Sequence, residues 1–346
     1  MPKWIGNRFG NNPVGVTTFY VSAVHKMWDQ YYAKQSGGWK EQPFTASGGA
    51  TWTASQGGFT YTYHAFTSSS DFTVLTGTKQ VEALIVAGGG GGGAGRDSGG
   101  GGAGGFRVVT SDILTPGPYS IVVGAGGQGM PYYPGYSSGD THSSGTRGNP
   151  STAFGFVSTG GGARTGPSGP AGQETGGSGA GSAFQGTFGA GNSPPVSPPQ
   201  GNPGGSGGYV YPGPEPGFGC GGGGGAGAVG GNALIPGPYA TGDGGIGTRS
   251  DSISPLAWSI PGSYGTSGPQ PGRYFAGGGG GGGGTFNGTP GGGNGGSGGG
   301  GNKGFGGSNG TSNTGGGGGG GNFQLNNNYA GGSGGSGIVF IRYISS

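Results

Sequence analysis

Cysteine and charged residues are scarce in this sequence, and their scarcity excludes several classes of protein. Cys220 is the only cysteine, so the chain can form neither an internal disulfide nor a thiolate metal site. Charged residues make up 7% of the chain and the net charge is +3, which argues against nucleic acid or an acidic membrane as the main partner. No stretch approaches the roughly 20 consecutive apolar residues of a membrane-spanning helix, and no apolar core of a secretory signal is visible near residue 1.

Sequence patterns for catalysis and cofactor binding are also missing. Residues 81–95 run from a strand pattern into glycines, as in a dinucleotide-binding unit, but residues 96–105 are too rich in glycine for the helix that such a unit needs. His25, His64 and His142 lack the spacing of metal ligands, and no predicted element pairs two carboxylates. We therefore expect no enzyme activity, no cofactor and no metal site, and we interpret His64, which lies among aromatic residues, as structural.

Glycine is the residue that the sequence has in excess, at 105 of 346 positions. Ordering a glycine backbone costs roughly 1–2 kcal/mol per residue or more, and glycine has no side chain with which to build a core. A polyproline-II-like helix has about three residues per turn and directs its N–H and C=O groups outward, so all-glycine helices of this kind can pack closely and bond to one another. We predict a bundle of such polyglycine-II helices. Its longest runs are residues 88–93, 221–225, 277–284 and 315–321.

A glycine bundle needs a conventional folded base, and alternating apolar patterns predict one. Strands are expected at residues 59–66, 71–75 and 81–87, and two more lie far downstream, at 119–123 and 338–343. The last of these should return to pair with residues 81–86, so that a small antiparallel β-sandwich seals the base of the bundle. The expected fold is therefore mostly β and irregular. Its domains are residues 39–87, completed by 106–123 and 338–344, and the glycine-rich residues 88–337.

The N-terminal residues 1–38 form a third predicted domain, an anchoring arm followed by one short α-helix. Residues 18–34 have apolar side chains at helical spacing, and two alternatives remain: the helix packs on the neighbouring domain, or it docks into a larger assembly. Residues 1–16 are either an extended arm docked on a partner or a frayed terminus. The predicted assembly anchors are Trp4, Ile5, Phe9, Tyr20, Val24, Met27, Trp28 and Tyr31.

Loops rich in proline and aromatic residues interrupt the glycine segments at residues 130–136, 193–200, 209–216 and 253–275. Proline lowers the entropy that a loop loses on binding, and tyrosine and tryptophan offer rigid amphipathic contact area. Such loops can form a recognition surface for sugars or protein. The alternative is that the rings cover the sides of the bundle, and we expect at most a third of them to be available to a ligand. The candidate receptor-binding residues are Tyr132, Tyr133, Tyr136, Tyr209, Tyr211, Trp258, Tyr264 and Tyr274.

The strand patterns and the opening of the chain also carry a resemblance. Residues 63–66, 72–74, 81–90 and 334–343 resemble glycine-rich tail-fibre and adhesin proteins of tailed bacteriophages, and residues 4–10 and 27–32 look like the start of virion proteins of marine phages, especially cyanophages. The resemblance implies a polyglycine-II bundle that carries receptor-binding loops in some adhesins. The N-terminus does not look like the fibre-attachment domain of the T-even adhesins.

The resemblance implies a virion structural protein, assembled in the host cytoplasm, that forms a tail fibre or tail-associated appendage. Its expected partners are other tail proteins, through the N-terminus, and a host surface polysaccharide or outer-membrane protein, through the aromatic loops; no nucleic acid is expected. Several copies per virion or a homo-oligomer are implied. The alternative is a secreted or surface glycine-rich coat protein that binds no receptor.

Overall fold

The structure is a computed structural model. The chain divides into two compact units, Met1–Pro43 and Phe44–Ser346. The predicted N-terminal arm, helix and assembly anchors lie outside the described residues. The described residues are 42–134, 144–164, 172–183, 186–210, 217–233, 241–253, 257–285, 291–324 and 327–345.

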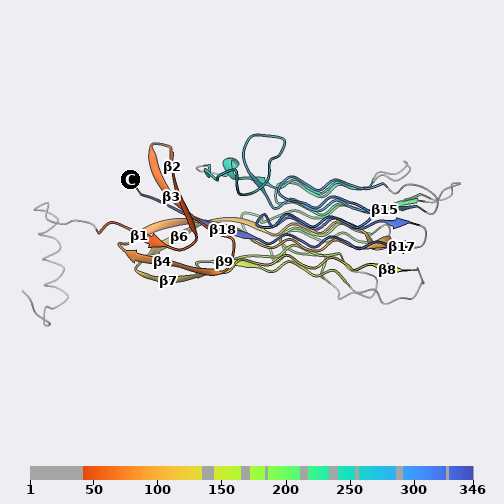
Figure 1. Ribbon diagram of the computed structural model, residues 1–346, viewed down its shortest axis with the longest axis horizontal. Coiled ribbons are helices and arrows are strands. Elements are labelled where there is room, and N and C mark those ends of the chain that lie inside the picture. Colours follow the sequence, from red (N-terminus) through yellow and green to blue (C-terminus); the bar gives the residue numbers. More distant parts are fainter. Residues whose placement is uncertain are drawn as a thin grey trace, which may run out of the picture. The chain divides into compact units, whose positions relative to one another are not determined.

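Among the described residues, a five-stranded antiparallel sheet contains the longest strands of the second unit (Figure 1). Its strand order is β2-β3-β18-β5-β6, so β18, the last strand in sequence, lies between β3 and β5. Residue Phe340 of β18 is paired with Ala65 on one side and Leu84 on the other. The bounds are β2 Ala50–Gln56, β3 Phe59–Phe66, β5 Lys79–Val86, β6 Phe106–Leu114 and β18 Ile338–Ile344.

A three-stranded antiparallel sheet packs against one face of the five-stranded sheet. Its order is β1-β4-β7, with bounds Thr45–Ser47, Ser70–Thr76 and Gly117–Ile121. Phe72 of β4 and Ile121 of β7 belong to the same buried cluster as Ile85 and Ile341 of the larger sheet. The two sheets therefore share one apolar core, as the two layers of a small sandwich do.

The other face of the five-stranded sheet is buried as well. Leu84 and Phe340 belong to a second cluster that includes Trp258 and Phe275, which come from the segment that follows the middle glycine runs. A strand with both faces covered needs apolar residues in succession rather than in alternation. This explains the continuous apolar run of β5, whose last four residues are all buried.

Extended glycine-rich segments fill the space beyond the sheets and are joined by backbone hydrogen bonds. Successive amides of residues 88–93 donate to three different neighbouring segments, with N···O distances of 2.8–3.1 Å. Amides three residues apart donate to the same neighbour: Gly89 to Gly335 and Gly92 to Gly332. Residues 277–282 follow the same rule, with acceptors in residues 298–301, 242–245 and 98–101. Each inner segment is therefore bonded in three directions with a period of three residues.

Close approach of backbones explains why these positions are glycine. A Cβ atom on Gly90 would lie 2.1 Å from the carbonyl oxygen of Gly162, and one on Gly317 would lie 2.0 Å from that of Gly101. Both distances are far inside van der Waals contact, and the obstacle is backbone that is itself fixed by hydrogen bonds. The spacing between segments therefore requires residues without side chains.

Short strands and 3-10 turns complete the second unit. A six-stranded sheet, ordered β11-β12-β15-β16-β17-β8, includes one parallel pair, β15 with β16, and Figure 1 shows β8, β15 and β17 at the end of the glycine segments opposite β1 to β7. Strands β9 and β10 form a tight antiparallel hairpin, and β13 pairs antiparallel with β14, which follows it in the chain after 24 intervening residues. The bounds are β8 Tyr133–Pro134, β9 Ser151–Ala153, β10 Phe156–Ser158, β11 Gly208–Val210, β12 Gly217–Gly219, β13 Thr248–Arg249, β14 Tyr274–Phe275, β15 Gly283–Thr285, β16 Phe323–Gln324, β17 Asn327–Asn328, η2 Gly95–Asp97 and η3 Ser250–Ser252.

The predicted strand positions and the predicted return of the C-terminal strand are confirmed. The expected strands correspond to β3, β4, β5, β7 and β18, and β18 pairs antiparallel with β5 from Ile338 to Arg342. The mostly β character is confirmed too, and within the described residues the only helical segments are the two 3-10 turns.

Candidate ligand-binding surface

Three aromatic side chains form a cluster next to β8 and β17. Figure 1 shows these two strands at the end of the glycine segments away from the five-stranded and three-stranded sheets. The ring of Tyr329 lies 5.9 Å from that of Tyr132 and 5.4 Å from that of Phe305, measured between centroids. Tyr132 is 47% exposed and Phe305 is 55% exposed, while Tyr329 is half-buried. We call these three residues the aromatic cluster.

Backbone pairing brings the three rings together from distant parts of the sequence. Tyr132 directly precedes β8 and Tyr329 directly follows β17, and these strands pair with Asn328 opposite Tyr133. Asn322 links Phe305 to Tyr329. Its N–H donates to the carbonyl of Phe305 (3.1 Å), and its carbonyl accepts from the N–H of Tyr329 (3.0 Å). The cluster is thus held by backbone bonds at its base.

A small buried core supports this end of the molecule. Phe218 of β12 and Phe323 of β16 pack with centroids 6.0 Å apart, and Cys220 completes their cluster. The side-chain oxygen of Asn322 accepts a hydrogen bond from the amide of Gly283 at 3.1 Å. Packed aromatic rings and satisfied buried amides fix the strands from which the exposed rings project.

The aromatic cluster itself carries no charge. Lys303 is two residues from Phe305, but its aliphatic chain lies over Gly292, since a Cβ placed there would be 2.1 Å from Cδ of Lys303. Uncharged rings with exposed faces can take flat, amphipathic groups.

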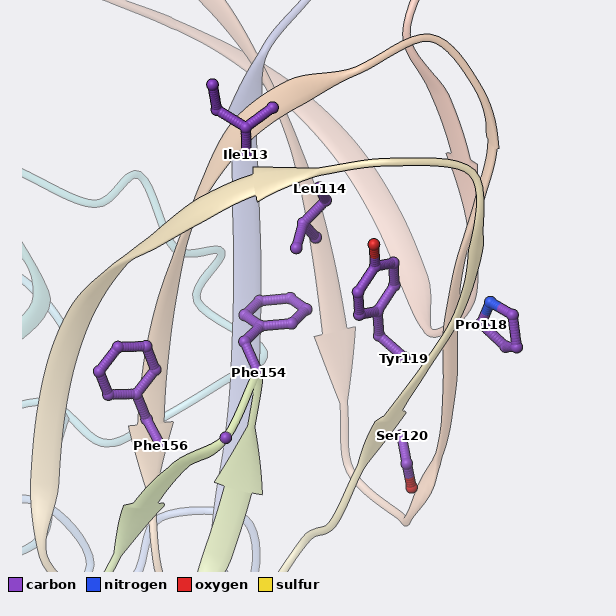
Figure 2. A pocket seen from close by; sticks show the side chains of 8 residues that line it. Ile113, Leu114, Pro118, Tyr119, Ser120, Phe154 and Phe156 are labelled. Carbon is purple, nitrogen blue, oxygen red and sulfur yellow. The ribbon is translucent and has the colours of Figure 1, made fainter.

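A second candidate surface is a pocket of about 500 Å³ on the sandwich (Figure 2). Figure 2 shows the ring of Phe154 between those of Phe156 and Tyr119, below Leu114. Phe154 lies in the left-handed region, with φ 53°, followed by Gly155 with φ 77°. Positive φ at both residues is what a tight two-residue hairpin turn requires, and it is strained for a bulky side chain. The residues that line the pocket are Ile113, Leu114, Pro118, Tyr119, Ser120, Phe154, Gly155 and Phe156.

The pocket can accept an apolar or uncharged group but offers little for directed polar recognition. All of its lining side chains are uncharged. The hydroxyl group of Tyr119 donates to the carbonyl of Thr115 at 2.9 Å and accepts from the amide of the same residue at 3.1 Å. Its hydrogen-bonding capacity is therefore used within the protein.

Two of the candidate receptor-binding residues belong to the interior, and a third, Tyr264, is partly buried against it. Trp258 is 2% exposed and Tyr274 is 3% exposed, so neither presents a surface to a ligand. The ring of Tyr264 packs against those of Trp52 and Phe340, at centroid distances of 5.9 and 5.4 Å. These rings cover the open face of the five-stranded sheet, and burying them there removes more apolar area from water than projecting them would. In this loop, the described aromatic rings pack on the fold.

A buried arginine explains the position of Trp258. The guanidinium carbon of Arg342 lies 4.4 Å from the ring centroid of Trp258 and 4.8 Å from that of Tyr61. Its Nε donates to Glu82 at 2.5 Å and its Nη1 to the carbonyl of Ala257 at 2.7 Å. A buried cation needs such pairing, so Trp258 is part of the fold.

The remaining candidates are placed only in part. Tyr133 belongs to β8 and Tyr209 to β11, where Tyr209 pairs with Phe218. Tyr136 and Tyr211, like the predicted N-terminal anchors, lie outside the described residues. Of the predicted tyrosines, Tyr132 is the one that the structure describes as strongly exposed.

Phe305 and Tyr329 were not among the candidates from the sequence. Each is an isolated ring between small or polar neighbours, in Gly304-Phe305-Gly306 and Asn328-Tyr329-Ala330. A single ring with no apolar partners nearby in sequence has nothing local to pack against, and that isolation is the signal that could have identified them.

The described residues contain no group of three or more His, Cys, Asp or Glu side chains that could bind a metal ion. None of the described helical segments has the length and apolar character of a membrane span. His64 is 1% exposed and its Nδ1 lies 2.7 Å from the carbonyl oxygen of Gly48. Burial lowers its pKa below the usual value of 6.5, and the bond to Gly48 acts in the opposite direction. A neutral histidine packed on Phe72 and Tyr343 fits the structural role expected for it.

Comparison with known proteins identifies a family. A family model described as a glycine-rich domain matches residues 64–344, which include β5, β18, the glycine segments and the aromatic cluster. No curated protein matches the sequence.

Proposed function

The chain belongs to the glycine-rich domain family, and from that premise we propose that it is a structural protein of a bacteriophage virion. In this proposal it forms a tail fibre or tail-associated appendage, present in several copies per particle. The N-terminal residues attach it to other tail proteins, and the end that carries the aromatic cluster contacts the host surface. The resemblance of the strand and glycine segments to phage tail-fibre proteins supports the assignment.

We propose further that the glycine segments are polyglycine-II helices. Hydrogen bonds from amides three residues apart reach the same neighbour, as Gly278 and Gly281 do with Gly245 and Gly242. A helix with about three residues per turn and outward-pointing N–H groups produces this repeat. Such a bundle can hold a surface away from a particle without a large apolar core.

The observation that carries the host-contact proposal is the exposure of Phe305 and Tyr132 beside short strands that backbone bonds fix in place. Exposed aromatic rings that gather on one surface mark a contact site more often than isolated exposed residues do. The opposite end of the same glycine segments carries the two packed sheets (Figure 1). The exposed rings are therefore separated from the sandwich by the length of the bundle.

Two measurements on the full-length protein test the proposal. Gold-labelled antibodies against the chain should mark the tails of purified virions in electron micrographs, and the purified protein added in excess should reduce adsorption of the phage to its host. Absence of the chain from purified virions would contradict the whole assignment. Tail labelling without any effect on adsorption would retain the structural role and remove the host contact.

A further inference from the structure

The aromatic cluster suggests the chemical class of the host ligand, an inference that rests on the proposed function. We propose that Phe305, Tyr329 and Tyr132 form a binding platform for the pyranose rings of an uncharged surface polysaccharide. Proteins and sugars can both contact aromatic rings, so the choice depends on exposure, ring geometry, charge and rigidity.

Ring exposure and geometry fit a ligand with flat C–H faces. The planes of Tyr329 and Phe305 are inclined at 60°, and those of Tyr132 and Tyr329 at 55°. The rings therefore do not stack face to face, and roughly half of the surface of Phe305 and of Tyr132 is exposed to solvent. An aromatic face is the negative end of a quadrupole, and the C–H groups on one side of a pyranose ring are weakly positive. Each open face can thus take one sugar ring.

Charge favours an uncharged sugar over an acidic one. None of the three residues carries a charged group, because phenylalanine ends in a hydrocarbon ring and tyrosine in a neutral phenol. The methylene groups of Lys303 lie along Gly292. The guanidinium of Arg96 lies over the ring of Phe218, 6.0 Å from its centroid. Phosphate, sulfate or uronate groups call for arginine or lysine that faces the ligand. A platform of Phe and Tyr alone gives such groups no counter-ion.

Polar groups for sugar hydroxyls lie close by in the sequence. Asn302 and Ser308 are both exposed and flank Phe305 at three residues on either side. The amide of Ser308 donates to the carbonyl of Asn302 at 2.8 Å, which fixes the loop that bears Phe305. The side-chain oxygen of Asn302 accepts a hydrogen bond from the amide of Gly295 at 2.8 Å, so the sugar hydroxyls would be met by the side-chain NH2 group of Asn302 and by the hydroxyl group of Ser308.

The rigidity of the aromatic cluster favours a ligand that repeats the same unit, such as a polysaccharide. The cluster stands on the backbone bonds of Asn322 and on the packed rings of Phe218 and Phe323. A fixed platform loses little conformational entropy when it binds. Each sugar contact can therefore be weak, and several copies of the chain on one particle add their contacts by avidity.

The test uses the full-length protein, host cells and two treatments that separate the ligand classes. Wild-type protein should bind cells that have been digested with a protease and should lose binding to cells oxidised with periodate, which cleaves the vicinal diols of sugars. Neutral polysaccharide purified from the host envelope should compete, whereas an acidic polysaccharide such as alginate should not. Sensitivity to protease with resistance to periodate would overturn the sugar assignment and indicate a protein receptor.

Two variants and a matched control locate the site. Phe305→Ala and Tyr132→Ala should each weaken binding to the purified polysaccharide at least tenfold without lowering the melting temperature. Phe188→Ala is the control, because Phe188 is 49% exposed and lies outside the cluster, and it should bind as wild type does. Equal affinities for wild type, Phe305→Ala and Tyr132→Ala would overturn the site even if the sugar is correct. Failure of wild-type protein to bind untreated cells would instead contradict the host-contact part of the proposed function.

Discussion

Space, rather than backbone conformation, requires glycine at most inner positions of the bundle. Gly280 illustrates this, because a Cβ atom there would lie 2.2 Å from the carbonyl oxygen of Gly293. That oxygen belongs to a segment that is itself hydrogen bonded to Gly281. A methyl group cannot be accommodated by rotating a side chain, so the segments have to separate and lose bonds.

Gly280→Ala should therefore lower the free energy of unfolding by about 3 kcal/mol or more, above the usual range for one methyl group, because backbone must move. Gly262→Ala is the control: no atom lies within 4 Å of its Cβ position, and its effect should stay within about 0.5 kcal/mol. Denaturant titration followed by circular dichroism measures both. Equal stabilities for the two variants would contradict close packing of the glycine segments.

His64 makes the free energy of unfolding of the sandwich depend on pH. Burial lowers its pKa. In the folded protein, His64 therefore stays neutral at pH values where the same imidazole is already protonated in the unfolded chain. Unfolding then takes up a proton as the pH falls below about 6.5, the usual histidine value, and the free energy of unfolding decreases down to the pKa of the folded state. Above pH 6.5 the residue is neutral in both states and has no such effect.

Replacing His64 by glutamine should remove this part of the pH dependence. Wild type and His64→Gln are compared by their urea midpoints at pH 7.5 and at pH 5.5, and the wild-type midpoint should fall further. His25 and His142 are the same in both proteins, so they cancel in the difference. An equal fall in both proteins would mean that His64 does not titrate differently on folding.

At the scale of elements, β18 holds the sandwich together. It pairs on both sides, with β3 and β5, and its Arg342 crosses to the loop that covers the sheet. The side chain of Arg342 is 1% exposed and that of Glu82, its partner, is 26% exposed. The strand therefore contributes hydrogen bonds, apolar area and a buried ion pair from seven residues.

Arg342→Met should lower the free energy of unfolding by about 3 kcal/mol. This is at the lower end of the range for breaking a buried ion pair, because Glu82 can still reach water. The control is Arg249→Met. Arg249 also pairs with a carboxylate, Asp251, at 2.9 Å, but both side chains are partly exposed, and its loss should cost below about 1 kcal/mol. Thermal unfolding of the two variants measures the difference. A larger effect at Arg249 would contradict the structural role assigned to Arg342.

The strands could be located from the sequence because their patterns are local. Alternation in β3 and the continuous apolar run of β5 identify strands and also indicate how many faces are covered. What covers the second face could not be foreseen. Loop 253–275 has proline and aromatic residues whether it faces water or protein, and only the tertiary contacts of Trp258 decide between the two.

The aromatic cluster was predictable only in part for a similar reason. Tyr132 lies in a loop with several rings and was identified, whereas Phe305 and Tyr329 are single rings in glycine- and asparagine-rich segments. Their proximity depends on the pairing of β8 with β17 and on the bonds of Asn322. Two-residue strands leave no periodic pattern in a sequence, so this pairing has no local signal.

At the scale of the whole unit Phe44–Ser346, the bundle and the sandwich form one compact body. Ala87 follows β5 directly, and its amide donates to Gly105, which directly precedes β6, at 3.0 Å. The sheet hydrogen bonds thus continue without a break into the first pair of glycine segments.

Amide hydrogen exchange should reflect this continuity. The amides of residues 277–282, each bonded to another segment, should be protected to the same degree as those of β5 and β18, because they open only when the unit unfolds. Mass spectrometry of peptides after timed exchange measures the protection, with residues 261–272 as an internal reference that should exchange faster. Exchange of residues 277–282 at the rate of a random coil would contradict the hydrogen-bonded bundle.

The place of β18 in the middle of the five-stranded sheet also sets an order of events during translation. Residues 338–344 leave the ribosome after all of the glycine segments, and until then β3 and β5 have no strand between them. Until then, the glycine-rich stretch of the growing chain is present without the completed sheet. It exposes little apolar surface, because glycine has no apolar side chain. A messenger cut short before codon 338 would yield a product that has every glycine segment and no completed sheet to close it.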